Sequence, residues 1–438
     1  MMKHTLNHRR SGSMIATVVL LGLIIVALVL SGCSSQKAAT PTPTKTPKPP
    51  ETATPLPTAT YTPVPSATAS STPVPTNTPL PSPTATDETK AASGNNPGET
   101  LTPTPTPTSE PDIHLIDPST TTDICPLTGL KVSDTSVLER PPLAIKVSNF
   151  PSVVRPQAGL DKADVIFEHY AEGNLTRFTA IFLSQDAEKV GSVRSGRLLD
   201  LEIPAMFRSV LAFSGASGGV KQKFRDSDIF DQIISPDFGH PVGNPGNAPF
   251  YRVPQEGKAI EHTMFTDTPA LWKYATEKLG YSGRQEIKGW VFSEELPPGG
   301  QPVTHVSIPY AAGSIVSEYT YAAAQSYFLR SITGEPHHEE LSGEQLHFDN
   351  VIVIYAHHVE TDILEDTWGG GHYSIQVQLW GEGPVRIFRD GQMFDGKWVR
   401  PDRWDLMRFV DGNGNPLPLK PGNTFIQMVP LGFEVDIN

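Results

Sequence analysis

A proline- and threonine-rich segment divides this chain and limits which part of it can fold. Residues 40–111 are nearly all Pro, Thr, Ala and Ser, with almost no apolar periodicity. Because alternating prolines fix φ and remove amide donors, polyproline II and disorder are the options left to this backbone. At ~3.1 Å per residue, such a segment reaches on the order of 200 Å when fully extended. We therefore predict a disordered stalk, followed by a folded part that begins near residue 124.

A hydrophobic run, Met14–Leu30, precedes the stalk and follows a basic head. Basic head, apolar middle and small residues at the end are typical of a secretory signal. Cys33 comes directly after Leu-Ser-Gly, and this spacing resembles the lipobox of bacterial lipoproteins. The resemblance implies cleavage before Cys33 and acylation of its thiol. Residues 1–32 are thus predicted as a lipoprotein signal peptide, and residues 33–112 as the lipid anchor site and stalk.

The same run of apolar residues leaves one alternative open. It lies at the lower edge of a membrane-spanning length, so an uncleaved transmembrane anchor also fits. Both interpretations place the bulk of the chain outside the cytoplasm. Several acyl chains on Cys33 hold a protein in the membrane far more firmly than one chain does. We predict an extracytoplasmic protein that is lipid-anchored to the bacterial cell membrane.

Charge and cysteine content exclude several classes of function. The chain has 34 Lys and Arg against 47 Asp and Glu, a net charge of −13. An acidic exported protein without a basic stripe is a poor candidate for binding nucleic acid, so no nucleic-acid partner is predicted. There are two cysteines, and acylation of Cys33 leaves Cys125 without a disulfide partner. The neighbours of Cys125 are apolar, which favours a partly buried linker end over a reactive thiol.

Removing the signal peptide and stalk leaves about 320 residues, enough for two domains of ordinary size. In residues 124–295, the turn signal Glu172-Gly173-Asn174 separates two apolar runs and predicts a hairpin. A helix is predicted at Thr268–Leu279, with Thr268 as its cap and Gly280 after its end. The strand patterns of this half are Leu143–Val147, Asp164–His169, Arg177–Ser184 and Ser209–Phe213.

Residues 301–438 follow a linker signal at Leu296–Gly300 and show little helical periodicity. They predict a mainly antiparallel β domain, in which Asp390-Gly391 is a hairpin signal. The fold class is therefore α+β, with an N-terminal mixed α/β domain at 124–295 and a C-terminal β-rich domain at 301–438. The main strand patterns of the second half are Val303–Ile308, Ile315–Tyr321, Gln325–Ser331, Val351–Tyr355, Tyr373–Trp380, Val385–Phe388 and Thr424–Val429.

Several short motifs are spread over both halves of the chain: Pro126–Leu130, Ala163–Glu168, Glu172-Gly173, Arg177, Val193–Arg197, Tyr327–Arg330, Asp349–Val353, Asp390-Gly391, Gly396–Trp398 and Pro421–Thr424. Together they resemble one family, the YerB-like lipoproteins, a bacterial family of two adjoining domains of unknown function (domain of unknown function 3048, N- and C-terminal). The resemblance implies an exported lipoprotein and supplies no established reaction. At His262-Thr263-Met264-Phe265 the sequence departs from the proline-histidine-asparagine-like pattern expected there.

The block Arg194-Ser195-Gly196-Arg197 is the main candidate for ligand binding. Arginine forks bind carboxylates and phosphates, and a glycine beside them lets a ligand approach the backbone. A salt-bridge network with nearby glutamates explains the same residues as structure. We expect Glu168 and Arg177 to be structural, and Arg194 and Arg197 to contact a ligand. No catalytic residue is assigned, and the ligand-binding candidates are Arg194, Ser195, Arg197, Glu168, Glu172, Arg177 and His262.

The histidines of the second half do not form a recognisable metal motif. A zinc site needs three or four ligands that converge in space, and adjacent histidines on a strand point to opposite faces. No fixed helical spacing occurs in this set, so we predict no metal site and no cofactor. The histidines considered are His337, His338, His347, His357, His358 and His372.

Three functions are consistent with these observations. The first is a non-enzymatic binding or scaffolding lipoprotein, displayed on a long spacer, that recognises cell-wall polymer or an envelope protein. The second is an extracytoplasmic hydrolase or transferase with a non-standard site around Glu168, Arg194 and His262. The third is a solute-binding lipoprotein with a ligand in the interdomain cleft. The stalk and the missing catalytic signature favour the first, so an enzyme is not the expected class.

Overall fold

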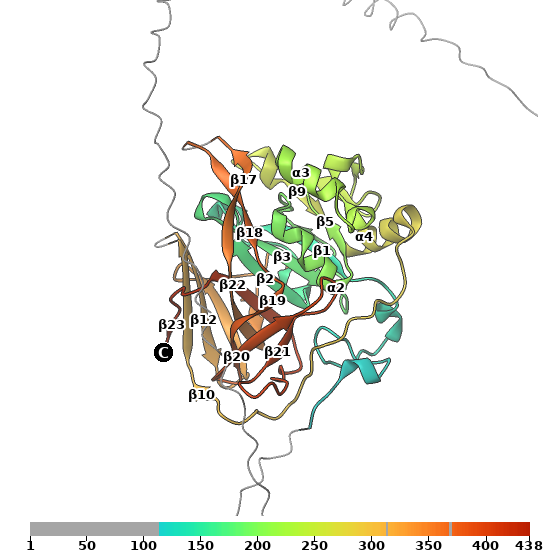
Figure 1. Cartoon of the computed structure of the whole chain (residues 1–438). Coiled ribbons are helices and arrows are strands. Elements are labelled where there is room, and N and C mark those ends of the chain that lie inside the picture. Colours follow the sequence, from blue (N-terminus) through green and yellow to red (C-terminus); the bar gives the residue numbers. More distant parts are fainter. Residues whose placement is uncertain (1–113, 312–313, 368–369) are drawn as a thin grey trace, which may run out of the picture. The chain divides into compact units, whose positions relative to one another are not determined.

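The computed structural model of the chain describes residues 114–311, 314–367 and 370–438 (Figure 1). The predicted signal peptide, the acylation site Cys33 and the stalk lie outside the described residues. Among the described residues, no helix has the length and apolar character needed to cross a membrane. The α+β class predicted from the sequence is confirmed, with helices in the first half and mainly antiparallel strands in the second.

A large mixed sheet runs through both halves of the described chain. Within the described ranges it has 11 strands, of which β21 (Arg408–Val410) pairs with β20 at the side. The other strands, in spatial order, are β10 (Gln301–Pro302), β20 (Gln392–Arg400), β19 (Gly381–Arg389), β16 (Asn350–Ala356), β22 (Thr424–Pro430), β2 (Val165–Tyr170), β3 (Thr176–Phe182), β1 (Leu143–Ser148), β5 (Val210–Ala212) and β6 (Ile233–Ile234).

The two halves meet inside this sheet, at the pairing of β2 with β22. The two strands are parallel, with Val165 opposite Thr424 and Glu168 opposite Gln427. On its other side β22 is parallel to β16, whereas β2 forms the predicted antiparallel hairpin with β3. β22 is hydrogen-bonded on both sides and covered on both faces, so its residues are buried in succession, including the polar Gln427 in its middle.

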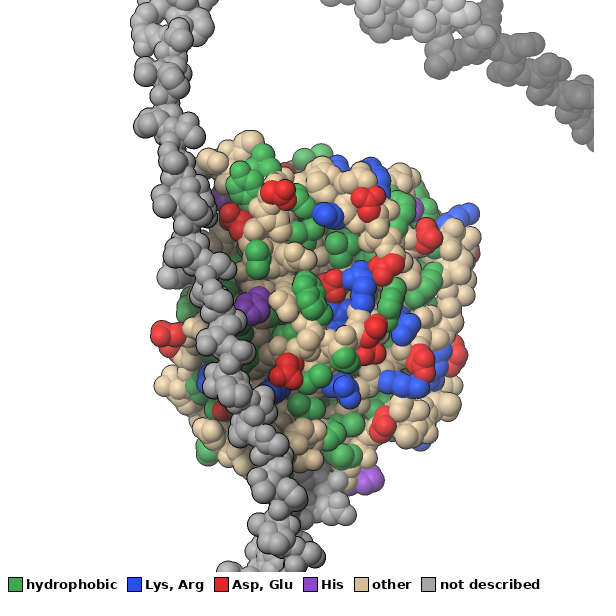
Figure 2. Space-filling view, in the orientation of Figure 1, with side chains coloured by type: hydrophobic (Ala, Val, Ile, Leu, Met, Phe, Trp, Pro, Cys, Tyr) green, Lys and Arg blue, Asp and Glu red, His purple; other side chains and the backbone are tan. Residues whose placement is uncertain are grey.

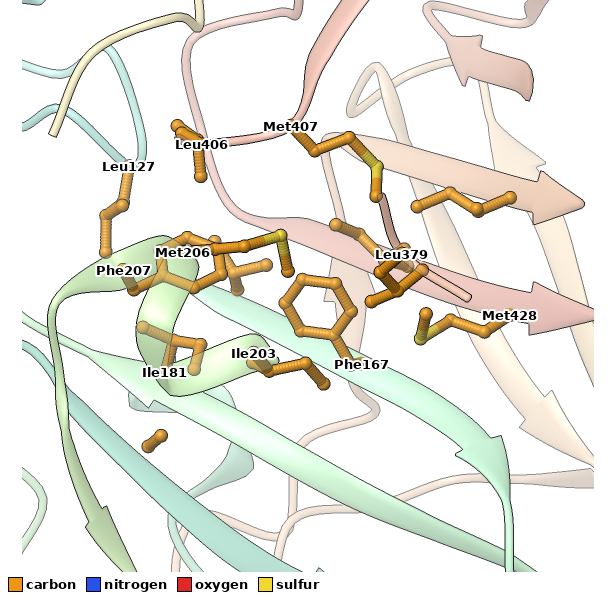
Figure 3. Close-up of a cluster of buried hydrophobic side chains, with 14 of the residues drawn as sticks. Leu127, Phe167, Ile181, Ile203, Met206, Phe207, Leu379, Leu406, Met407 and Met428 are labelled. Carbon is orange, nitrogen blue, oxygen red and sulfur yellow. The ribbon is translucent and has the colours of Figure 1, made fainter. Parts of the chain in front are cut away.

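Side-chain alternation along these strands divides the core between the two faces of the large sheet. Phe167 and Ile426 belong to one buried cluster, whereas Ile166 and Phe425 belong to the other. Figure 3 shows part of the first cluster, in which α2 (Ile203–Phe207) packs beside Phe167. The same view includes Leu379, Met407 and Met428 from the second half, so this cluster is built by both halves.

A second, antiparallel sheet packs against the opposite face through the other buried cluster. Its strands show the half-buried alternation that a sheet with one covered face requires. In the described residues it has six strands, with β15 (His347–Phe348) pairing beside β13. The remaining order is β14 (Glu335–Pro336), β13 (Tyr327–Ile332), β12 (Ile315–Ala322), β11 (His305–Ala311) and β23 (Asp436–Ile437).

Two smaller sheets are also present in the described part. The two-stranded hairpin β17–β18 (His358–Asp366 and His372–Val377) lies beside α3 (Gly218–Arg225) in Figure 1. On the face shown in Figure 2, basic and acidic side chains are interspersed with hydrophobic ones. A small sheet has the order β4 (Val190–Gly191), β9 (Met264–Thr266), β8 (Phe250–Arg252) and β7 (Val242–Gly243).

The helix predicted at Thr268–Leu279 is present, but its cap is different. The helix α4 spans Thr268–Tyr274, continues as a wider turn to Leu279 and ends at Gly280 in the left-handed region. The cap is Asp267, whose carboxylate accepts a hydrogen bond from the amide of Ala270 at 2.7 Å. The Thr268 hydroxyl accepts instead from the amide of Ala187 at 2.8 Å. The predicted cap was therefore one residue too late.

Candidate functional site

Two buried polar clusters lie at the same end of the central strands, one on each face of the large sheet. Glu168 and His169 are neighbours on β2, so they point to opposite faces. The register with β3 places Glu168 opposite Phe178 and His169 opposite Arg177. Glu168, which the sequence motif groups with the arginines, is thus separated from Arg177 by the sheet itself.

Glu168 is the centre of the cluster that faces the second sheet. Its side chain has no exposed surface, and it forms an ion pair at 2.9 Å with Arg330, which is also fully buried. Arg330 additionally donates to Nδ1 of His337. Both oxygens of the Glu168 carboxylate accept hydrogen bonds, and their donors come from both halves of the described chain. The donors to Glu168, at 2.7–3.0 Å, are Asn149, Thr176, Ser317, Arg330 and Gln427.

The opposite face carries what we call the arginine cluster: Arg177, Arg194, Arg197, Glu172 and His262. Arg177 lies on β3, and Glu172 lies in the β2–β3 turn. Arg194 is fixed because its amide donates to Lys146 on β1 at 3.0 Å. The preceding amide, of Val193, donates to Met264 at 2.7 Å, which holds this segment beside the turn that carries His262. The structure therefore brings these five candidates together.

Arg197 is the paired member of the arginine cluster. Its guanidinium donates to both carboxylate oxygens of Glu172, and both side chains are nearly buried. A second carboxylate, Glu365 on β17, lies 3.8 Å away. Burial alone raises the pKa of Glu172, but the charge and hydrogen bonds of Arg197 outweigh it and lower that pKa to about 2. This pair is the salt bridge that the structural interpretation of the sequence expected.

Arg177 is the unpaired member. Its side chain is 3% exposed, and no described carboxylate forms an ion pair with it. One nitrogen donates to the carbonyl of Thr176 at 2.9 Å, whereas Nε has no hydrogen-bond partner. Burial and repulsion by Arg197 and Arg194 lower the pKa of Arg177 to about 9, with Glu172 acting in the opposite direction. Arg177 is thus a buried cation that has no ion-pair partner among the described residues.

Arg194 and His262 complete the unpaired side of the arginine cluster. Arg194 is partly exposed, and its one side-chain hydrogen bond, to the carbonyl of Glu261, is long at 3.4 Å. Its Nε and the Nδ1 atom of His262 are buried without a partner. Burial and the neighbouring Arg194 lower the pKa of His262, so its imidazole is held neutral. The two residues leave unsatisfied nitrogen atoms beside the buried Arg177.

Ser195 connects the arginine cluster to a glycine-rich loop. The amide of Gly196 donates to the carbonyl of Gly215 at 2.9 Å, and a Cβ at Gly215 would lie 2.9 Å from the Ser195 hydroxyl. Gly215 has φ of +94°, so both its conformation and this approach require glycine. The loop then enters α3, which is capped by Ser217. Ser195 therefore packs closely against the backbone of Gly215.

A buried charged group next to the arginine cluster, centred on Lys146 and Asp200, was not predicted from the sequence. Lys146 lies 2.8 Å from Asp200, with both side chains fully buried, and 2.6 Å from Nε2 of His169. Burial lowers the pKa of Lys146 to about 8, although Asp200 opposes the shift. Asp200 also accepts from the amide of Arg197 at 2.7 Å. A lysine inside the apolar run Leu143–Val147 was the available signal, because buried lysine is rare without a partner.

Comparison with known proteins agrees with the resemblance in the motifs. A family model described as a protein of unknown function (DUF3048), N-terminal domain, matches residues 127–282, and its C-terminal counterpart matches residues 306–426. The chain is 31% identical over 308 residues to YerB of Bacillus subtilis (strain 168), which is named as a candidate lipoprotein. That alignment covers 70% of this chain and 86% of YerB. This chain belongs to the DUF3048 family.

A solved structure of the DUF3048 family is also similar. The crystal structure of YerB from Bacillus subtilis matches with a TM-score of 0.60 at 27% sequence identity. The match covers 72% of this chain and 99% of that one. The name of YerB specifies neither an activity nor a ligand, so residue roles in this family member come from its own geometry.

The cysteine and two of the candidate histidines of this DUF3048 protein are buried or bonded to neighbouring side chains. Cys125 is fully buried, and burial raises its pKa to about 12, which keeps the thiol protonated and unreactive. His337 is engaged by Arg330 and Gln157, and His372 pairs with Asp366. Among the described residues, no group of three or more His, Cys, Asp or Glu side chains is placed to hold a metal ion.

Proposed function

We propose that this protein is a lipid-anchored, non-enzymatic binding protein of the bacterial envelope, and that its arginine cluster binds an anionic group of a cell-wall polymer. Arg177 is the observation that carries this proposal. Burying a charged group without a partner is costly, and the cost falls when an opposite charge with hydrogen-bond acceptors arrives. A carboxylate or phosphate beside Arg177 and Arg194 supplies that partner.

The charge balance of the arginine cluster supports the proposal. Three guanidinium groups are present, and Arg197 already holds the carboxylate of Glu172. Guanidinium groups bind carboxylate and phosphate oxygens in a bidentate manner, so the cluster matches the anionic groups of wall polymers. Arg194 is the partly exposed member of the cluster, whereas Arg177 is buried. In this arrangement His262 contributes a neutral nitrogen without adding charge.

Membrane attachment rests on Cys33 and on the similarity to YerB. The signal sequence ends in a lipobox-like spacing, and the relative is named as a candidate lipoprotein. The Pro/Thr-rich segment then serves as a spacer that carries the binding part away from the membrane. Metabolic labelling with a radioactive fatty acid should mark the wild-type protein but not Cys33→Ala. Equal labelling of the two proteins would contradict the anchor.

Anion binding can be tested on the full-length protein in detergent by isothermal titration calorimetry. Inorganic phosphate, acetate and a soluble polyol-phosphate polymer serve as probes. We expect the polymer to bind most tightly, with an affinity that falls as salt is added. Arg194→Gln should weaken binding about tenfold or more while leaving the melting temperature nearly unchanged, because Arg194 makes one long hydrogen bond.

The matched control is Arg386→Gln, which alters a partly exposed arginine on β19 that pairs with Asp395. Its affinity for the polymer should equal that of the wild type. Absence of binding to all three probes, or an Arg194→Gln variant that binds as well as wild type, would refute the site. Retention of an envelope protein instead of the polymer, lost in Arg194→Gln, would replace the polymer by a protein partner.

A further inference from the structure

A pocket of about 400 Å³ lies where the two halves of the described chain meet, away from the arginine cluster. One wall is a turn of the first half, and the other is the β13–β14 connection with the histidines that follow it. Pockets of a few hundred Å³ are the size that small molecules occupy. The lining residues are Ser152, Arg155, Pro156, Ile332, Thr333, Glu335, Pro336, His337 and His338.

Arg155 is the charged group of this seam pocket. One of its terminal nitrogens donates to the carbonyl of Asn149 at 3.1 Å, whereas its Nε is buried and has no partner. None of the described carboxylates forms an ion pair with it. Burial and repulsion by Arg330 lower the pKa of Arg155, and Glu168 offsets this shift in part. Arg155 is therefore a half-buried cation that lines the pocket, and one of its nitrogens has no hydrogen-bond partner.

Apart from the exposed Glu335 at its rim, much of the pocket surface is apolar. Ile332, Pro156 and Pro336 offer apolar surface beside the guanidinium. His337 is 2% exposed, and its Nδ1 accepts from Arg330, because a guanidinium can only donate. Its Nε2 then donates to Gln157 at 2.6 Å. The ring is thus fixed and neutral, and burial together with Arg330 lowers its pKa well below the ordinary value.

We propose that the seam pocket binds a small monocarboxylate with an apolar body. The carboxylate pairs with the guanidinium of Arg155, and the body packs against Ile332, Pro156 and Pro336. A single guanidinium matches a single carboxylate in bidentate geometry. Glu335 at the rim disfavours a dianion such as phosphate, which separates this ligand class from that of the arginine cluster. The site is independent of the function proposed above.

The proposal can be tested with phenylacetate as the probe and the full-length protein in detergent. Phenylacetamide, which has the same shape without the charge, and phenethylamine, which carries the opposite charge, are matched ligands. We expect saturable binding of phenylacetate by calorimetry, at least tenfold weaker binding of phenylacetamide and no binding of phenethylamine. Methyl-selective NMR should place the perturbed resonances on Ile332.

Variants separate this pocket from the arginine cluster. Arg155→Gln should weaken phenylacetate binding about tenfold or more. Ser152→Trp, at an exposed rim position, should block the pocket while the protein stays folded. Arg194→Gln and Arg386→Gln should both bind phenylacetate as the wild type does. Equal affinity for phenylacetate and phenylacetamide, unchanged affinity in Arg155→Gln, or no binding up to about 10 mM would each overturn the proposal.

Discussion

The buried arginines of this protein fall into two kinds. Arg330 and Arg400 are fully buried and have carboxylate partners, Glu168 and Glu202. Arg177 is nearly as buried but has a single hydrogen bond to a backbone carbonyl. Removing one partner of a buried ion pair costs several kcal/mol of unfolding free energy, so the paired arginines stabilise the fold. An unpaired buried arginine such as Arg177 is instead the candidate for binding an anion.

The ion pair between Glu168 and Arg330 gives the first prediction. Glu168→Gln leaves Arg330 buried without an opposite charge, so the free energy of unfolding should fall by about 3–5 kcal/mol. Urea denaturation followed by circular dichroism measures this loss. The control is Glu382→Gln, whose pair with Lys397 is exposed and should contribute about 0–1 kcal/mol. Equal losses in the two variants would show that burial does not decide the strength of the pair.

Glu172 gives a prediction about pH. Its pKa is about 2 in the folded protein, against 4.5 for an unperturbed glutamate, so the unfolded chain takes up the proton first as pH falls. The stabilisation is therefore complete above pH 4.5 and is lost between pH 4.5 and about 2. By linkage it amounts to about 3 kcal/mol. Unfolding curves across this range should show a steeper loss for wild type than for Glu172→Gln, and parallel slopes would contradict the assignment.

At the residue scale, the sequence predicted near neighbours better than distant ones. Pairing of the arginines with Glu172, which lies 25 residues before Arg197, was one of the two interpretations, although Arg197 itself was expected to contact a ligand. The partner of Glu168 is 162 residues away in the chain, and no local pattern points to Arg330. Glu168 also lies on the opposite face of β2 from the arginine cluster. Predicting this separation requires the register of β2 with β3, which the sequence does not give.

At the scale of elements, local patterns predicted most strands but not their order. The hairpin at Glu172–Asn174 and a strand at Thr424–Val429 were expected, and the structure has the turn and the strand β22 at Thr424–Pro430. The parallel pairing of β2 with β22 joins strands far apart in the chain, and no local sequence pattern indicates which strands become neighbours. The β17–β18 hairpin was predicted only in part, because His358–Asp366 alternates weakly and carries many charges.

Gly396 on β20 provides a test at this scale. A Cβ at this position would lie 2.4 Å from the carbonyl oxygen of Val410 and 2.5 Å from a methyl of Leu417. Gly396→Ala should therefore disturb the β20–β21 pairing and cost about 1–3 kcal/mol of unfolding free energy. Gly412→Ala, where a Cβ meets open space, is the matched control and should be within about 0.5 kcal/mol of wild type. Thermal unfolding of both variants measures these losses, and equal stability of Gly396→Ala and Gly412→Ala would contradict the prediction.

At the scale of the whole molecule, the two family segments share one sheet and two buried clusters. β22 from the second segment lies between β16 and β2, and Glu168 of the first segment bonds Gln427 of the second. The domain boundaries at 124–295 and 301–438 stay predictions from the sequence. The shared sheet argues that neither segment completes its own core.

Fragments that span residues 114–296 and 301–438 test this view. Expressed alone, each should unfold without a sharp cooperative transition, since each lacks strands that cover its apolar surface. Expressed together, the two fragments should co-purify and regain one cooperative transition. Calorimetry on the single and mixed fragments measures both outcomes. A sharp transition for residues 114–296 alone would show that the first half folds independently.

The late position of β22 in the chain has a consequence for how this protein matures. The first half leaves the ribosome with one edge of β2 unpaired, because Gln427 on the strand that closes this edge lies 259 residues after Glu168. Contacts of such long range form slowly, and an open strand edge invites association with other chains. A chain truncated before residue 424 therefore keeps this edge open, so a protein shortened at its C-terminus is prone to aggregate through β2.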